Sequence, residues 1–487
     1  MNATKQKPSA VTRADGAYRI LVNGEWVDGK GAVRAVTDKY RLQPGAQITT
    51  ADAAQVTQTV AAAHEAFRRG APGPFERGAI LERAAVLLEG RADEFVRTMQ
   101  MEAGFTASDG GGEVRRCIQT LKLSAEEARR LAGEVVPLAG APQQAGRFGF
   151  TLRVPLGVVA AITPFNSPLN TVAHKIAPAF AAGNAVILKP ASHTPLTACI
   201  LVQVLLEAGV PPGFLSLLYG SAEVAEVLLA DQRVRFFAFT GSTEVGRSIQ
   251  QAAGLRRTQM ELGSIACTIL CDDANLDKAL PKIINASYRK AGQVCTSIQL
   301  LLTHESIVGQ VESKLAERVK ALPYGDPYKP DTVVGPLISE PEAVRVEAWI
   351  EEAVAQGAKR LVGGPRKGAV VPPTLLTSIS DSMKVGCREV FGPILCIVPF
   401  DRLDAAIARV NSTPYGLACG IFTDRLGDAF EAARRLDVGG VHVNETSSSR
   451  VDLMPYGGSK DSGFGREGPR YAVHEMTEER IVTFAFG

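Results

Sequence analysis

Between residues 157 and 253, short apolar segments alternate with longer segments in which apolar residues recur at helical spacing. Short apolar runs bounded by Gly, Pro or Asn are typical of strands buried on both faces, and parallel strands need crossover helices between them. The alternation predicts a parallel sheet covered by helices on both sides, that is, a doubly wound α/β domain. We expect strands at 157–163, 185–189, 215–219 and 234–240, and helices at 171–182, 195–208, 222–230 and 242–253.

The remaining segments predict a second domain and an arm. At 487 residues, the chain is longer than one hydrophobic core usually supports. A second α/β alternation begins near residue 262, with strands at 268–271, 299–303, 394–400 and 439–443, and helices after Asp277 and at 307–320. Helical patterns cover 52–69 and 77–100, and a Gly-rich break at 110–112 precedes a helix at 113–131. Two strand-like pieces then surround a polar turn, which predicts a hairpin that serves as an oligomerisation arm.

Composition argues against several classes of partner. The net charge is +2, from 53 basic and 51 acidic residues, so no basic surplus indicates binding to nucleic acid or anionic lipid. No apolar run approaches the ~18 residues of a membrane span. The polar residues 1–16 predict a loose, flexible tail and no secretory signal. The 8 cysteines are too few for a dense disulfide framework and lack zinc spacing, so we expect a cytoplasmic protein without a metal site.

One glycine motif is a decoy for nucleotide binding. Gly463 to Gly468 reads GxGxxG, but the motif needs a strand before it and a βαβ unit after it. Here a polar loop precedes it and only a short tail follows. A better phosphate-binding turn is FTGSTEVG at 239–246, which follows an apolar strand and opens a helix. An ordinary turn with Ser242 as helix N-cap explains the same pattern.

Four further residues are candidates for the chemistry, and each of them also has a purely structural explanation. Cys295 lies among small polar residues and is either a nucleophile or one more structural thiol. Glu261 ends an apolar strand, where burial would raise its pKa toward that of a general base, or it is a surface residue at a strand end. Asn166 either donates to an oxyanion or holds a turn. Lys189 ends a strand where a ribose could bind, or it is solvated.

Seven motifs together resemble the aldehyde dehydrogenase superfamily, from about Val22 to the C-terminus. In sequence order they are TPFNSPLN at 163–170, AGNAVILKP at 182–190, FTGSTEVG at 239–246, ELG at 261–263, GQVCTS at 292–297, EVFGP at 389–393 and PYGGSKDSGFGREG at 455–468. The resemblance implies NAD(P)-dependent oxidation of an aldehyde to a carboxylic acid through a cysteine thioester. It also implies a Rossmann-like cofactor domain (17–133 and 156–260), a catalytic domain (261–473) and an arm (134–155 and 474–487), with assembly into homodimers or homotetramers.

The resemblance also implies a role for each site residue. Cys295 would be the nucleophile, Glu261 the general base and Asn166 the oxyanion donor, with Glu467 assisting proton release. The cofactor would contact Lys189 and Glu389 at the riboses, Phe391 at the nicotinamide, Gly241 and Ser242 at the pyrophosphate, and Thr163, Phe165 and Ser192 elsewhere in the pocket.

The chain departs from the family pattern at three positions. Ser264 replaces the second glycine after ELG and is expected to crowd the loop that carries Glu261. Ser192 replaces a glutamate that repels the 2′-phosphate of NADP, so we expect NADP to be accepted as well as NAD. Val294 stands where relatives acting on phosphorylated aldehydes carry an arginine, so it forms an apolar wall.

The substrate expected from these residues is a small or medium aldehyde. Arg450 and Arg115 or Arg116 are candidates for contacting a carboxylate or hydroxyl tail, as in the lactaldehyde and phosphonoacetaldehyde-like branch that the chain resembles most. Two alternatives remain. The first is an enzyme that transfers the acyl group to coenzyme A, against which Glu261 argues. The second is an inactive protein that keeps the fold as a binding or structural scaffold.

Overall fold

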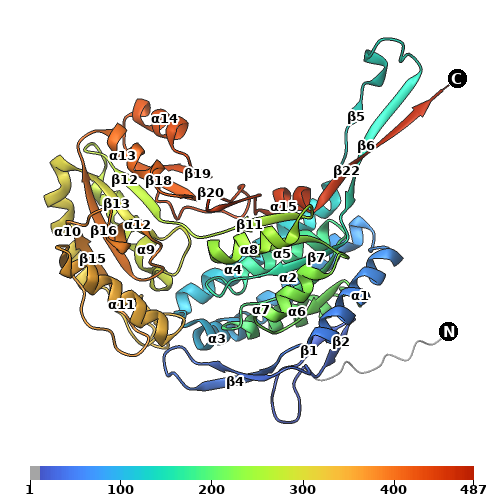
Figure 1. The fold of residues 1–487 in the computed structure, drawn as a ribbon, viewed down its shortest axis with the longest axis horizontal. Coiled ribbons are helices and arrows are strands. Elements are labelled where there is room, and N and C mark those ends of the chain that lie inside the picture. Colours follow the sequence, from blue (N-terminus) through green and yellow to red (C-terminus); the bar gives the residue numbers. More distant parts are fainter. Residues whose placement is uncertain (1–10, 487) are drawn as a thin grey trace.

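The computed structural model describes residues 11–486, which form two α/β lobes and a projecting arm (Figure 1). The first lobe is built on an eight-stranded sheet, the second on a seven-stranded sheet and the arm on a three-stranded sheet. Of the predicted tail, residues 1–10 lie outside the described part of the chain. Within the rest of it, Thr12 pairs with Tyr18 in an isolated bridge.

Parallel strands form the centre of the first lobe, as predicted. The sheet order is β2-β1-β9-β8-β7-β10-β11-β21. The central strands β9, β8, β7, β10 and β11 each run parallel to their neighbours among these five. Chain order reverses between β7 and β10, and ligands of open α/β sheets bind at the carboxyl ends of strands beside such a switch point. The strands are β1 (Ile20–Val22), β2 (Glu25–Val27), β7 (Val158–Ile162), β8 (Ala185–Lys189), β9 (Leu215–Leu217), β10 (Val234–Thr240), β11 (Arg257–Glu261) and β21 (Gly463–Phe464).

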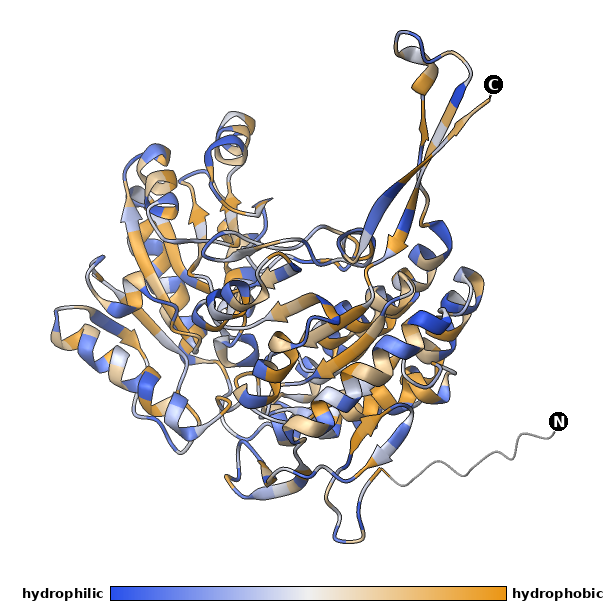
Figure 2. Cartoon of the chain, turned by 45° about the vertical axis from the view of Figure 1, so that its right-hand side comes forward, coloured by the Kyte–Doolittle hydropathy of each residue, from blue (hydrophilic) through white to orange (hydrophobic). Residues whose placement is uncertain are grey.

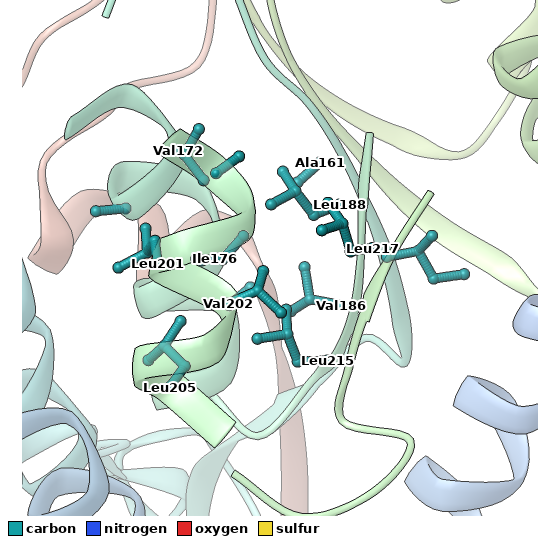
Figure 3. Packing of buried hydrophobic residues seen from close by; sticks show 14 of the residues in the cluster. Ala161, Val172, Ile176, Val186, Leu188, Leu201, Val202, Leu205, Leu215 and Leu217 are labelled. Carbon is teal, nitrogen blue, oxygen red and sulfur yellow. The ribbon is translucent and has the colours of Figure 1, made fainter. Parts of the chain in front are cut away.

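Apolar packing holds these central strands in place. Figure 3 shows Val202 of α6 facing Val186 of β8 and Leu215 of β9. Each of these side chains is buried, and burying one aliphatic side chain contributes about 1.5–3 kcal/mol. The covering helices are α5 (Asn170–Ala181), α6 (Pro195–Glu207), α7 (Ala222–Ala230) and α8 (Thr243–Ala253). The doubly wound prediction is therefore confirmed, with strand and helix bounds within a few residues of those expected.

The N-terminal helices correct one prediction. They are α1 (Ala53–Arg69), α2 (Pro74–Gly90), α3 (Ala92–Ala103) and α4 (Ala107–Arg130), so the segment 77–100 is two helices, and 110–112 lies inside α4. Thr106 caps α4 through a capping box with Asp109, which starts the helix before the glycines. A Cβ at Gly110 would lie 3.4 Å from Val96 of α3, so the glycine lets the two helices pack closely. This packing and capping outweigh a propensity cost of about 1 kcal/mol per glycine.

The second lobe contains the sheet β14-β15-β16-β13-β12-β18-β19. Its strands are β12 (Ala266–Leu270), β13 (Ile298–His304), β14 (Lys359–Val362), β15 (Thr374–Thr377), β16 (Ile394–Phe400), β18 (Ala418–Phe422) and β19 (Gly440–Val443). Its helices are α9 (Leu276–Tyr288), α10 (Val308–Lys320), α11 (Glu340–Ala355), α12 (Lys384–Cys387), α13 (Leu403–Asn411) and α14 (Leu426–Arg435), with the 3-10 turns η2 (Arg289–Gly292) and η3 (Glu305–Ile307).

The smaller elements outside the two main sheets are β3 (Val33–Thr37), β4 (Pro44–Thr49), β17 (Tyr415–Gly416), β20 (Ser459–Lys460) and α15 (Pro469–Glu475).

The arm projects from the first lobe and ends near the C-terminus (Figure 1). It comprises β5 (Val135–Val136), the 3-10 turn η1 (Leu138–Gly140), β6 (Arg147–Pro155) and β22 (Thr477–Ala485). The long strands β6 and β22 pair antiparallel over their whole length. Phe148, Phe150, Phe484 and Phe486 pack against one another along it, and three of these four rings are exposed.

Apolar residues concentrate in the sheets and on the inner faces of the helices (Figure 2). Across residues 11–486, none of the helices combines the length and the hydropathy that a membrane crossing requires.

Candidate active site

Cys295 lies in a short loop between α9 and β13 of the second lobe. The loop begins in η2, where Lys290 and Ala291 have positive φ angles of 52° and 54°. Left-handed backbone at non-glycine residues costs roughly 1–3 kcal/mol and persists only where surrounding contacts hold it. Gly292 also has a positive φ, and a Cβ there would lie 2.0 Å from the Gly392 carbonyl oxygen. The strained loop is therefore tightly packed, and it presents Cys295 half-buried.

Lys290 joins this loop to the loop that carries Asn166. Its buried ammonium group donates to Glu113 Oε1 at 2.7 Å and to the Asn166 carbonyl oxygen at 3.0 Å. Glu113 also accepts from Ser167 Oγ at 2.8 Å and from the Asn170 backbone N–H at 2.9 Å. Although burial alone would raise it, the charge of Lys290 helps to lower the pKa of Glu113 to about 2. An ionised pair thus fixes the Asn166 loop against the cysteine loop.

Glu261 is the last residue of β11 and is buried. Burial, followed by the nearby charge of Glu467, raises the pKa of Glu261 to about 7. Its Oε1 atom makes no hydrogen bond with any of residues 11–486. Glu261, Cys295 and Asn166 all line one cavity of about 870 Å³ between the lobes. The structure therefore brings together the three side chains proposed as base, nucleophile and oxyanion donor.

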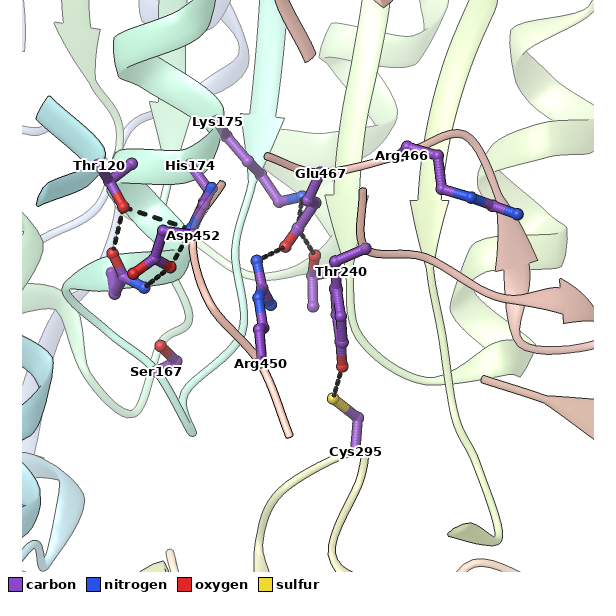
Figure 4. A network of polar contacts seen from close by, with 12 residues as sticks. Thr120, Ser167, His174, Lys175, Thr240, Cys295, Arg450, Asp452, Arg466 and Glu467 are labelled. Atoms are coloured by element: carbon purple, nitrogen blue, oxygen red, sulfur yellow. Dashed lines mark hydrogen bonds and ion pairs between the residues drawn. The ribbon is translucent and has the colours of Figure 1, made fainter. Parts of the chain in front are cut away.

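Glu467, whose charge acts on Glu261, lies in a buried ionic network (Figure 4). Its carboxylate accepts from Lys175 Nζ at 3.0 Å, from Arg450 at 2.9 Å and from Thr240 Oγ1 at 3.1 Å. Although burial opposes ionisation, the charges of Lys175 and Arg450 hold the pKa of Glu467 well below its usual range. Glu467 is therefore a fixed anion between two cations in this state.

Tyr456 contacts the nucleophile directly, and the sequence analysis did not single it out. Its Oη lies 2.9 Å from Cys295 Sγ, and the Arg450 guanidinium carbon lies 3.7 Å from the centre of its ring. The residue belongs to the PYGG motif, so the sequence signal was present but was not interpreted. Lys290 and Glu113 were missed as well, because these two hydrogen-bonded partners lie 177 residues apart in the chain.

Most of the proposed cofactor residues line the cavity at the carboxyl ends of β7, β8 and β10. Its volume of about 870 Å³ falls in the range of small-molecule and cofactor sites. Buried Thr163 Oγ1 has no hydrogen-bond partner among the described residues, so it is available to a polar ligand. Burial lowers the pKa of Lys189 to about 8 and raises that of Glu389 to about 7. Lys189 of the first lobe and Glu389 of the second lobe both line the cavity, and an ammonium and a carboxyl group are suited to the hydroxyl groups of ribose, so the residues fit a nicotinamide dinucleotide.

Of the remaining cofactor candidates, all except Ser192 line the cavity. Gly241 and Ser242 line the cavity at the start of α8, and Ser242 Oγ accepts from the Val245 N–H at 3.4 Å, so the N-cap reading holds. Phe165 and Phe391 pack edge to face with ring centres 5.8 Å apart. Ser192 does not line the cavity; its hydroxyl donates to the Gly220 carbonyl oxygen at 3.2 Å.

The loop after Glu261 is held by Glu389. Glu389 Oε1 accepts from the backbone N–H of Ser264 at 2.9 Å. A Cβ at Gly263 would lie 2.8 Å from Glu389 Oε2, so a larger residue at that position would push the Glu389 carboxyl group aside. Ser264 itself is buried and accommodated.

The arginines proposed for the substrate have unequal surroundings. Arg450 is compensated by Glu467, as described above, and Arg116 donates to Asp452 at 2.6 Å. Arg115 lies exposed on α4, and Val294 is half-buried beside Cys295.

A further arginine, Arg289, was missed by the sequence analysis. It donates to Ser448 Oγ at 2.7 Å, and its charge interacts with that of Cys295. Within residues 11–486, no carboxylate oxygen lies within 4.0 Å of a guanidinium nitrogen of Arg289, so the arginine forms no ion pair there. Burial lowers the pKa of Arg289, and the nearby charges of Asp109 and Glu113 offset this effect only in part.

Comparisons with known proteins agree with this architecture. The sequence model of the aldehyde dehydrogenase family matches residues 26–482. A 3-sulfolactaldehyde dehydrogenase of Priestia megaterium is 47% identical over 466 residues, covering 96% of this chain and 97% of the relative.

Two solved structures also match nearly the whole chain. Aldehyde dehydrogenase 21 from Physcomitrella patens, in complex with the reaction product succinate, has a TM-score of 0.94 and 38% identity, covering 96% of this chain and 98% of that one. A glyceraldehyde-3-phosphate dehydrogenase from Methanocaldococcus jannaschii, complexed with NADP, has a TM-score of 0.89 and 34% identity, covering 93% and 99%.

Proposed function

The chain belongs to the aldehyde dehydrogenase family and is an NAD(P)-dependent aldehyde oxidoreductase, and from this premise we propose that its substrate is a small aldehyde with an anionic tail. The observation that carries the proposal is Arg289, a half-buried cation near Cys295 whose side-chain hydrogen bond within residues 11–486 goes to the hydroxyl group of Ser448. A carboxylate or sulfonate would compensate this charge through charge-assisted hydrogen bonds. The 47% identical relative acts on a sulfonated aldehyde, and a neighbouring structure contains a dicarboxylate product.

The proposed reaction uses the three side chains that share the cavity. The Cys295 thiolate attacks the aldehyde carbon, and the Asn166 side chain together with the Cys295 backbone N–H stabilises the oxyanion. When bound, the oxidised nicotinamide cofactor accepts the hydrogen and two electrons that leave the aldehyde carbon. The residual acyl group is then a thioester on Cys295. Glu261 takes a proton from water, the resulting hydroxide attacks the thioester, and the carboxylic acid leaves as the thiolate is restored.

A substrate panel tests the role of Arg289. The panel compares 3-sulfolactaldehyde and succinate semialdehyde with uncharged aldehydes of similar length. In the Arg289→Met variant, we expect kcat/KM for the anionic aldehydes to fall about 10- to 150-fold, the equivalent of about 1.5–3 kcal/mol for a hydrogen bond to a charged group. Values for uncharged aldehydes should change little. Arg434→Met, on the exposed face of α14, is the control. Equal losses on charged and uncharged aldehydes would contradict the proposal.

We also propose that NADP is accepted as well as NAD. Arg34 of β3 lies 3.3 Å from Ser221 Oγ, next to the cavity wall that contains Lys189, so two cations surround the expected position of a 2′-phosphate. Ser192 leaves no carboxylate at its own position, but exposed Glu223 lies 3.5 Å from Arg34 and would repel the phosphate. Glu223→Gln should therefore raise kcat/KM for NADP relative to NAD, and Arg34→Gln should lower it. NADP binding more than about a hundredfold weaker than NAD would contradict the proposal.

The arm supports a further proposal about assembly and compartment. Exposed Phe484 on β22 and exposed Phe148 on β6 stand opposite each other, with ring centres 6.3 Å apart, and form an apolar strip that is typical of a protein–protein contact. We propose that the arm joins copies of the chain into a homodimer or homotetramer. We also propose a reducing, cytoplasmic location, because all of the cysteines are free thiols and all lie within the described residues.

A further inference from the structure

Tyr456 is held in a fixed position against the nucleophile. Its side chain is buried, and its Oη lies 2.9 Å from Cys295 Sγ. Backbone hydrogen bonds in both directions join it to Glu467, with the Tyr456 N–H donating at 3.1 Å and the Glu467 N–H donating at 2.7 Å. The Arg450 guanidinium covers the ring at 3.7 Å and is itself held by Glu467. The phenol therefore has little freedom to point anywhere except toward the sulfur.

The surroundings of Cys295 disfavour its reactive form. Burial, followed by the charge of Glu261, raises the pKa of the thiol well above its ordinary value. A thiol in that state is a poor nucleophile, because the thiolate is the attacking species. Two cations face the sulfur from neighbouring elements, Arg450 from the loop after β19 and Arg289 from η2. Arg450 is largely compensated by its carboxylate partner, and Arg289 acts on the sulfur through its charge alone, so the direct hydrogen bond to the sulfur comes from Tyr456.

The phenol is suited to this task in both protonation states of the cysteine. When the thiol is protonated, either group can donate to the other. Once the thiol ionises, only the Tyr456 O–H can donate, and a hydrogen bond to a charged group favours the charged form. Burial, followed by the charges of Cys295 and Glu261, raises the pKa of Tyr456 well above its ordinary value, so the donor proton is retained. Arg450 draws electron density from the ring face, which strengthens the O–H as a donor.

We propose that Tyr456 is a catalytic residue that donates a hydrogen bond to the Cys295 thiolate and so supplies part of its nucleophilicity in the free enzyme. The proposal rests on the assignment of Cys295 as the nucleophile. Arg450 acts through the ring as a positioning residue, and Glu467 acts through Arg450. The hydroxyl group, and not the aromatic ring, carries the effect.

The test is the pH dependence of Cys295 alkylation by iodoacetamide in the full-length enzyme, measured without cofactor or aldehyde and localised by peptide mass spectrometry. In Tyr456→Phe, which removes only the hydroxyl group, we expect the apparent pKa of the thiol to rise by about one unit or more. Alkylation near neutral pH should then be about tenfold slower, with a similar limiting rate at high pH. Tyr324→Phe, which removes an exposed hydroxyl group from a loop in the second lobe, should match the wild type.

Two outcomes separate failure of this proposal from failure of the proposed function. If Cys295→Ser abolishes turnover but Tyr456→Phe titrates like the wild type, the role of Tyr456 is overturned and the nucleophile stands. If Cys295→Ser keeps wild-type turnover, both assignments fail. Direct titration of thiolate absorbance in the ultraviolet gives a second measurement of the same shift. This titration is made on the Tyr456→Phe protein once its measured melting temperature is shown to equal that of the wild type.

Discussion

The pKa of Glu261 predicts the pH dependence of turnover. A buried carboxyl group with a pKa of about 7 is only about one tenth ionised a unit below that pH and about nine tenths ionised a unit above it. Because the base acts in its ionised form, hydrolysis of the thioester should rise about tenfold between about pH 6 and pH 8. A glutamate with an ordinary pKa of about 4.3 is already about 98% ionised at about pH 6, so its rate would be nearly flat over the same range.

The assay is steady-state formation of reduced cofactor at saturating aldehyde and cofactor, beside the amplitude of the first turnover. Saturation removes the effect that titration of Lys189 and Glu389 in the free enzyme has on cofactor binding, because kcat reports only ionisations of the complex. Glu261→Gln should lower kcat by about 10²- to 10⁴-fold and abolish the pH dependence, while a first-turnover burst remains. A flat wild-type profile, or a Gln variant that keeps the wild-type rise, would refute the reasoning.

Two other variants probe the framework around the site. Lys290→Met leaves Glu113 as an unpaired buried charge, so we expect the free energy of unfolding to fall by about 3–5 kcal/mol in denaturant titration, and exposed Lys320→Met should leave it unchanged. Unchanged stability of Lys290→Met would show that the pair does not hold the loops. On the arm, Phe484→Glu places a charge on the apolar strip, and light scattering should detect dissociation to smaller species. A native mass identical to that of the wild type would show that assembly uses another surface.

The sequence was informative wherever chemistry follows local pattern. The run of buried strands with intervening helices predicted the doubly wound lobe, because apolar periodicity reports burial directly. Glu261 at the end of an apolar strand predicted a desolvated carboxyl group, and its raised pKa agrees. The predicted break at Gly110 was wrong, because close packing of α3 and α4 and the cap at Thr106 override glycine's low helix propensity.

Contacts between distant segments could not be predicted in this way. Tyr456 meets Cys295 across 161 residues, and nothing in the local pattern around either one indicates the other. Arg289 stands next to a lysine in a charged pair, and only the fold shows that the lysine finds a carboxylate while the arginine finds a hydroxyl group. Side-chain compensation of this kind depends on three-dimensional neighbours, so the arginine proposed to bind the tail differs from the candidates drawn from the sequence.

The most direct test of the account is intact-mass analysis of Glu261→Gln after mixing with cofactor and succinate semialdehyde. We predict a covalent adduct with the mass of the acyl group, localised to the peptide that contains Cys295 and absent from a Cys295→Ser, Glu261→Gln double variant. Reduced cofactor should form in an amount equal to the adduct, because acylation is complete while hydrolysis is blocked. Formation of reduced cofactor without any adduct on Cys295, or an adduct that persists in the double variant, would contradict the claim that this cysteine carries the thioester.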